Sequence, residues 1–147
     1  VNAAASQNMP AGLKVLLVED DAEVAAVADT FLKAMQCEVT KAATGEQAWR
    51  LLESGALFDL LLTDIALGPG MRGTDLAAQA ALRCPGMAVL LTSGFSSELI
   101  DADRDSPLSW ALLPKPYTRQ DLASAVSLAM AQANSAASTE SGSDSSL

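Results

Sequence analysis

The stretch FDLLLTDI, Phe58–Ile65, is almost continuously apolar as far as Thr63 and then presents an acidic side chain, Asp64. A short apolar run without polar alternation is typical of a strand that is covered on both faces. The stretch AVLLT, Ala88–Thr92, is a second run of this kind. The two runs therefore predict central strands of a parallel sheet with helices on either side.

The rest of the chain alternates between strand-like and helix-like patterns. Three further short runs are predicted strands: Leu13–Val18, Glu38–Ala42 and Ser109–Leu113. Helical patterns follow each strand: Val24–Met35, a segment opened by Thr44, Thr74–Leu82, a weak one at Ser96–Ala102, and a last one opened by a capping box of Thr118 and Asp121. Fivefold strand–helix alternation predicts an α/β fold with a doubly wound parallel sheet.

Length and composition predict one domain with polar ends. The chain has 147 residues, of which half are hydrophobic, enough for a single packed core. Residues 1–12 are expected to be a leader or linker, 13–133 the folded domain, and the Ser-rich segment 134–147 a disordered polar tail. Because position 1 is Val rather than Met, we expect the sequence to be part of a longer chain.

The charge and the absence of histidine exclude several functions. A net charge of −9 argues against binding to nucleic acid or to anionic membranes. Without histidine the chain cannot carry a Ser-His-Asp triad, a His-ligated zinc or a phosphohistidine of its own. Cys37 and Cys84 form no CxxC motif and are expected to be buried and reduced. With no apolar run long enough to span a bilayer and no signal peptide, we expect a cytoplasmic protein.

Chemically distinctive residues follow four of the five predicted strands. Glu19 and Asp20 follow the first, Asp64 ends the third, Ser93 follows the fourth, and Lys115 follows the fifth. The carboxyl ends of parallel strands meet at one edge of the sheet, where ligands bind. Crowded carboxylates need a cation, and Mg²⁺ takes carboxylate and phosphate oxygens as ligands. A carboxylate can also act as the nucleophile toward phosphorus while a lysine and a hydroxyl stabilise the phosphoryl oxygens.

Each of these residues also has a purely structural interpretation. The acids after the first strand, Asp21 included, could cap the following helix, where negative charge is favourable. Asp64 and Ser93 could belong to turns, and Lys115 could be an exposed loop residue. Such readings are plausible one at a time, but four strand ends that all carry phosphoryl-transfer chemistry favour a site.

Four segments together resemble the receiver domain of two-component response regulators, over about Leu13–Met130. They are VLLVEDD (Val15–Asp21), FDLLLTDI (Phe58–Ile65), VLLTSG (Val89–Gly94) and LPKPY (Leu113–Tyr117). The resemblance implies a flavodoxin-like (βα)₅ sheet with strand order 2-1-3-4-5. It also implies a domain that accepts a phosphoryl group from a partner's phosphohistidine with the help of Mg²⁺.

The resemblance further assigns a role to each matching residue. Asp64 resembles the phosphoacceptor, Ser93 the hydroxyl residue that bonds the phosphoryl group, and Lys115 the lysine that pairs with it. The Mg²⁺ ligands would be Asp20 and Asp64 directly, Glu19 through water, and the backbone carbonyl of Ala66.

The sequence departs from the family pattern in three places. The loop Leu67–Gly73 is one residue longer than usual between the phosphoacceptor and the following glycine. The position three residues before the lysine, often aromatic in the family, is Leu112, with Trp110 on the same strand face. The segment Phe95–Leu108 has few apolar positions at helical spacing, so its helix is expected to be short or irregular.

The resemblance leaves the context and the partners open. The stretch SGF (Ser93–Phe95) and the segment LPKPY are similar to receivers at the C-terminus of hybrid sensor histidine kinases, and a free-standing single-domain regulator is the alternative. Expected partners are a histidine kinase or a histidine phosphotransfer protein, with a second copy of the chain as a further candidate. Enzyme activity beyond autocatalytic phosphotransfer is not expected of this segment. The rival functions are a Mg²⁺-dependent phosphatase, disfavoured because Ala66 stands where a second Asp is typical, and a receiver that only binds partners.

Overall fold

A computed structural model describes residues 12–67, 69–94 and 110–145, with side chains described as far as residue 133. Five parallel strands form one sheet in the order β2-β1-β3-β4-β5. The strands are β1 (Lys14–Val18), β2 (Glu38–Ala42), β3 (Leu60–Asp64), β4 (Ala88–Ser93) and β5 (Ala111–Pro114). The helices of the described residues are α2 (Ala22–Ala34), α3 (Gly45–Glu53), α4 (Gly73–Arg83) and α6 (Arg119–Ser145). The predicted doubly wound sheet and its strand order are confirmed.

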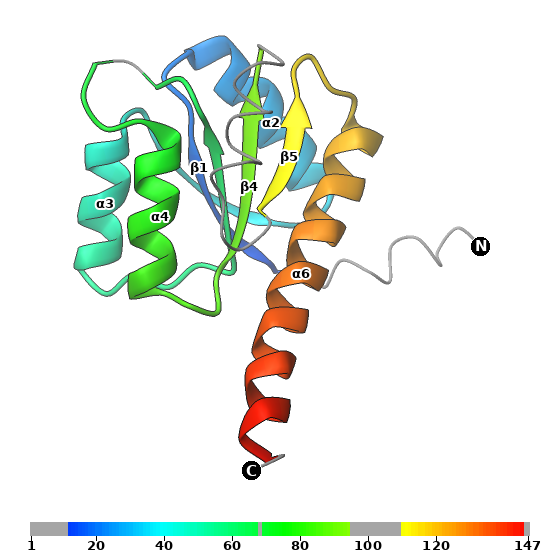
Figure 1. Cartoon of the computed structure of the whole chain (residues 1–147). Helices are drawn as coiled ribbons and strands as arrows, with labels where there is room; N and C mark the ends of the chain where they lie inside the picture. Colours follow the sequence, from blue (N-terminus) through cyan, green and yellow to red (C-terminus); the bar gives the residue numbers. More distant parts are fainter. Residues whose placement is uncertain (1–11, 68, 95–109, 146–147) are drawn as a thin grey trace.

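The sheet lies between two layers of helices, with α3 and α4 on one face and α2 and α6 on the other (Figure 1). Successive residues of each central strand point to opposite faces, so both core clusters draw on the same strands. Toward α3 and α4 point Leu16, Leu61 and Leu91. Toward α2 and α6 point Leu17, Leu62 and Leu90. Burial of each such side chain contributes about 1.5–3 kcal/mol to folding. A strand that is buried on both faces therefore consists of successive apolar residues, and such runs in the sequence predicted the central strands.

Polar side chains fix the starts of three helices where the sequence predicted them. Asp21 accepts hydrogen bonds from two backbone N–H groups of α2, at 2.9 and 3.2 Å. The hydroxyl of Thr44 accepts one from the third residue of α3, at 3.0 Å. Thr118 and Asp121 form the predicted capping box before α6, with both hydrogen bonds at 3.0 Å. Because each cap satisfies N–H groups that a helix leaves unpaired, these residues set the boundaries of the elements.

The start of α4 and the burial of one cysteine differ from what the sequence predicts. Helix α4 begins at Gly73, one residue before Thr74. Helix α6 continues to Ser145. Cys37 is buried as expected, but Cys84 is only partly buried because it follows the last turn of α4.

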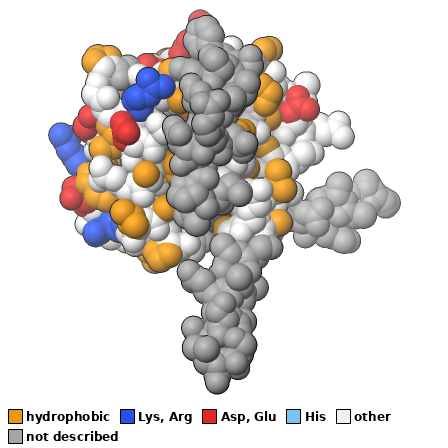
Figure 2. Space-filling model, in the orientation of Figure 1, with side chains coloured by type: hydrophobic (Ala, Val, Ile, Leu, Met, Phe, Trp, Pro, Cys, Tyr) orange, Lys and Arg blue, Asp and Glu red, His pale blue; other side chains and the backbone are white. Residues whose placement is uncertain are grey.

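The surface on the α3–α4 face carries charges of both signs. Figure 2 shows acidic and basic side chains interspersed over these two helices, with apolar side chains between them. Within the described part of the chain, no helix combines the length and the apolar character that crossing a membrane requires. The weak helix predicted at Ser96–Ala102 lies outside the described residues.

Candidate functional site

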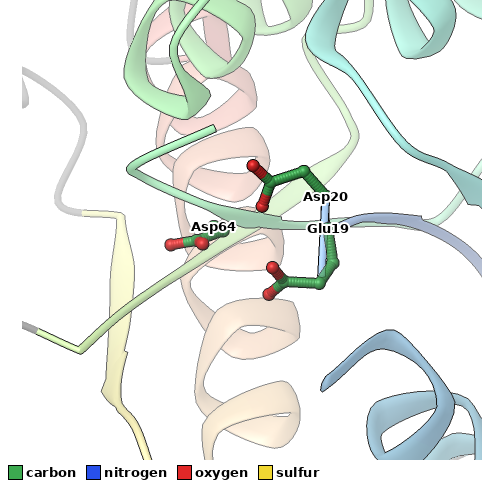
Figure 3. Close-up of side chains that lie close together, drawn as sticks. All are labelled: Glu19, Asp20 and Asp64. Carbon is green, nitrogen blue, oxygen red and sulfur yellow. The ribbon is translucent and has the colours of Figure 1, made fainter. Parts of the chain in front are cut away.

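Three carboxylates meet at the carboxyl ends of β1 and β3. The two strands are neighbours in parallel register, with Val18 opposite Thr63, so Glu19 and Asp64 come next to each other. Glu19, Asp20 and Asp64, hereafter the acidic group, each offer a carboxylate oxygen, and these oxygens lie within 4.8 Å of one another (Figure 3). Glu19 and Asp64 are buried, whereas Asp20 is exposed. The site is thus open to solvent at Asp20 and closed beneath it.

Lys115 brings a positive charge to the acidic group from the other side of β4. Its Nζ donates hydrogen bonds to Oδ2 of Asp64 at 3.1 Å and to Oε1 of Glu19 at 3.3 Å. Its backbone N–H donates to the carbonyl of Ser93 at 2.8 Å, which ties the end of β5 to the end of β4. The Lys115–Pro116 peptide bond is cis. The lysine side chain therefore reaches its partners from a backbone that is hydrogen-bonded to the end of β4.

The electrostatics of the site show an excess of negative charge. Burial, followed by the charge of Asp64, raises the pKa of Glu19, and the Asp21 N–H and Lys115 offset only part of this rise. Burial lowers the pKa of Lys115, but the charges of Asp64 and Glu19 and their hydrogen bonds outweigh it, so the pKa is raised. One ammonium faces three carboxylates, and the repulsion that remains favours a further cation.

The donor set fits Mg²⁺ in chemistry and in access. Three carboxylate oxygens within reach of a single ion are hard ligands of the kind that Mg²⁺ prefers. The exposed Asp20 faces solvent, which suits an ion that retains several water molecules. The N–H of Asp21 donates to Oε2 of Glu19 at 3.2 Å and so orients this buried carboxylate. The backbone and the acid positions thus make a ready site for a small divalent cation.

The remaining predicted residues lie beside the acidic group. Ser93 ends β4 and is buried, one residue beyond the pairing of Asp64 with Thr92. Ala66 is partly buried, and its N–H donates to Oδ1 of Asp64 at 3.3 Å. The structure therefore brings together all the residues that the sequence analysis assigned to the site. Asp21 stands apart as the cap of α2, as expected.

Two residues at the site were not singled out from the sequence. The N–H of Gly73 donates to the carbonyl of Ile65 at 3.0 Å, and Gly73 packs directly against the backbone of Asp64. The ring of Tyr117 packs edge-on against Phe31 with the ring centroids 6.3 Å apart. Burial and then the charge of Glu19 raise the pKa of Tyr117, which places its hydroxyl within the field of the acidic group. The glycine after the loop was visible in the sequence, but its closeness to Asp64 depends on how the loop folds back.

Comparison with known proteins identifies the family. The family model of the response regulator receiver domain matches residues 15–127. The sensor protein TorS of Escherichia coli (strain K12) is 31% identical over 114 residues, which are 76% of this chain and 12% of TorS. A crystal structure of a response regulator receiver protein from Sinorhizobium medicae WSM419 has a TM-score of 0.74 at 30% identity, covering 83% of this chain and 97% of that one. The receiver domain of the hybrid histidine kinase CckA has a TM-score of 0.66 at 31% identity, covering 80% and 98%.

These matches agree with the order of the strands in the sheet. The chain spans 12% of the length of TorS, so the similarity concerns one domain of that relative. The family model, in contrast, extends over most of the described sheet and its helices. The chain belongs to the response regulator receiver domain family of two-component systems.

Proposed function

We propose that this chain accepts a phosphoryl group on Asp64 from a phosphohistidine of a partner protein, with Mg²⁺ bound at the acidic group. The observation that carries the proposal is the contact between Nζ of Lys115 and Oδ2 of Asp64, at 3.1 Å, within a cluster of three acids. A buried carboxylate that is held by a lysine beside a cation site has the surroundings that phosphoryl transfer requires.

The chemistry follows from the residues. A carboxylate oxygen of Asp64 attacks phosphorus, the P–N bond of the phosphohistidine breaks, and the imidazole takes up a proton from water as it leaves. Once the Asp64 carboxylate carries the phosphoryl group, it no longer has the negative charge that paired with Lys115. The Lys115 ammonium is then close enough to pair with a phosphoryl oxygen, because it already contacts Asp64. Ser93, at the end of β4, is the nearby hydroxyl that could donate a hydrogen bond to the phosphoryl group.

Glu19, Asp20, Asp64 and the carbonyl of Ala66 would hold the Mg²⁺ ion. When bound, the ion supplies positive charge against the phosphoryl oxygens, which two carboxylates alone would repel. Glu19 would contact the ion through water, as the family resemblance implies. Asp20 and Asp64 remain as the direct carboxylate ligands.

We further propose that the domain works within a hybrid sensor histidine kinase in the cytoplasm, and that the donor is that kinase or a histidine phosphotransfer protein. The matches to TorS and to the receiver domain of the hybrid kinase CckA support this context. A free-standing regulator is the alternative. The two differ in whether a kinase domain is encoded in the same reading frame ahead of this segment.

The proposed reaction can be tested with a small acyl phosphate such as acetyl phosphate. With Mg²⁺, intact-protein mass spectrometry should show one added phosphoryl group per chain. Removal of Mg²⁺ with a chelator should slow labelling at least about tenfold, because the ion neutralises the transferring group. A single added group also separates this function from that of a phosphatase, which would release phosphate in many turnovers. A chain that takes no label, or takes it equally well without Mg²⁺, would contradict the proposal.

Mg²⁺ should also stabilise the fold, and Asp20 should be needed for this effect. An ion that binds only the native site, at ten times its dissociation constant, adds about 1.4 kcal/mol to the free energy of unfolding. We expect the Mg²⁺-dependent rise in melting temperature to vanish in Asp20→Ala. Without metal, this variant should melt at or above the parent's temperature, because one of three repelling carboxylates is gone. Glu23→Ala, which removes an exposed acid from the first turn of α2, is the matched control and should keep the rise. An Asp20→Ala variant that responds to Mg²⁺ like the parent would remove Asp20 from the ligand set.

A further inference from the structure

The loop between β3 and α4, residues 65–72, is held in its described part by a contact from another element. Oε2 of Glu46, in the first turn of α3, accepts a hydrogen bond from the backbone N–H of Met71 at 2.8 Å. The two residues are 25 positions apart, so the contact links two separate segments of the chain. The side chain of Met71 also packs on the core cluster beneath α3 and α4. A hydrogen bond from a backbone N–H to a carboxylate is stronger than one between neutral groups.

The conformation of Gly70 matches this contact. Gly70 has a φ of +103°, a conformation that glycine adopts at no steric cost. A Cβ placed on it would lie 2.6 Å from Oε2 of Glu46. The loop therefore turns at the one residue type that leaves room for the carboxylate. The Met71 N–H, followed by the N–H of Glu46 itself, holds the pKa of Glu46 below its usual value, as expected for a carboxylate that accepts these bonds.

The same loop is joined to the phosphoacceptor at both ends. At its start, the N–H of Ala66 donates to Oδ1 of Asp64. At its end, Gly73 donates to the carbonyl of Ile65 and lies against the backbone of Asp64. Met71 is two residues before Gly73, and Gly73 lies against the backbone of Asp64. A movement of Met71 would therefore be passed to the backbone that carries the reacting carboxylate.

We propose that Glu46 is a positioning residue for phosphoryl transfer: by binding the N–H of Met71 it holds the loop that sets the place of Asp64 and of the Ala66 carbonyl. This inference rests on the proposed function. Glu46 touches neither phosphorus nor the ion, and its effect passes through the loop.

The test compares two substitutions of Glu46 in the labelling reaction with acetyl phosphate and Mg²⁺. Glu46→Ala removes the acceptor and should slow labelling about tenfold, because small displacements of reacting groups are costly. Glu46→Gln removes the charge but keeps an acceptor oxygen, so its rate should stay within about twofold of the parent's. Rates are measured well below the melting temperature of each variant, so that a change in stability alone would not alter them.

A second pair of variants reaches the same contact from the loop. Gly70→Ala should slow labelling as Glu46→Ala does, since its methyl group would meet the carboxylate. Gly55→Ala is the matched control, because Gly55 also has a positive φ, +96°, but nothing within 4 Å of its Cβ position. This control should lose stability without losing its labelling rate.

The outcomes separate this inference from the function on which it rests. A parent chain that takes no label contradicts both. A parent that takes label normally, with Glu46→Ala equal to it, contradicts the positioning role alone. Equal slowing in Glu46→Ala and Glu46→Gln would also overturn it, since the charge and not the hydrogen bond would then be responsible.

Discussion

Substitution of Asp64 by Asn should abolish phosphorylation of this chain while leaving it folded. The amide has nearly the shape of the carboxylate but lacks the anionic oxygen that would attack phosphorus. Labelling with acetyl phosphate and Mg²⁺ should fall below detection, and peptide mapping of the labelled parent should locate the group on Asp64. Of the described acids, Asp64 and Glu19 combine burial, a contact with Lys115 and membership in the acidic group, and the Lys115 contact is shorter to Asp64, at 3.1 Å against 3.3 Å.

The fold should tolerate this change for an electrostatic reason. Lys115 would keep its contact with Oε1 of Glu19, so no buried charge is left without a partner. The charge of Asp64 also contributes to the raised pKa of Glu19, so its loss should bring this pKa closer to its usual value. We therefore expect the free energy of unfolding, measured in urea, to stay within about 1 kcal/mol of the parent.

Asp59→Asn is the matched control for the loss of a carboxylate near the same strand. Asp59 precedes β3 at the end opposite to the site, is exposed, and accepts a hydrogen bond from the Lys14 N–H. This variant should take label at the parent's rate. If Asp64→Asn took label as the parent does, the phosphoacceptor would have to be another residue.

The convergence of the site residues could be predicted from the sequence because parallel strands end at one edge. Apolar runs located β3 and β4, and the residues that follow such runs must meet wherever the strands are neighbours. The pairing of Val18 with Thr63, and of Asp64 with Thr92, places Glu19, Asp64 and Ser93 together without any further information. The sequence could not predict that the Lys115 side chain extends past β4 to Asp64, because this depends on the distance between the two residues, which only the structure supplies.

The loop contacts could not be predicted in the same way. In the sequence, Glu46 is an acid in the first turn of a helix, a common position that predicts no partner. Its contact with Met71 depends on the path of a loop that lies 25 positions further along the chain. Hydrophobic periodicity in the sequence thus predicts helices and strands, whereas contacts made by loops become known only from the three-dimensional structure.

Gly73→Ala should destabilise the fold and also impair the site. An added Cβ would overlap the carbonyl oxygen of Asp64 and would lie 2.8 Å from its carbonyl carbon and 3.0 Å from Cα of Ile65. All three atoms belong to the backbone, so the contact cannot be relieved by turning a side chain. We expect a loss of about 1–3 kcal/mol in the free energy of unfolding, the range typical of overpacking. Because the backbone of Asp64 must shift, labelling by acetyl phosphate should also slow at least about tenfold in the folded variant.

The sign of the stability change makes the prediction specific. At an open helical position, Ala is more favourable than Gly by about 1 kcal/mol, so helix propensity alone would make Gly73→Ala stabilising. Gly86→Ala provides the control, since Gly86 has nothing within 4 Å of its Cβ position and a φ outside the left-handed region. That variant should match the parent or gain up to about 1 kcal/mol through a less flexible unfolded chain, with an unchanged labelling rate. If urea unfolding showed Gly73→Ala to be as stable as Gly86→Ala, the close packing of Gly73 against Asp64 would be wrong, and the loop could not transmit its position to the phosphoacceptor through this contact.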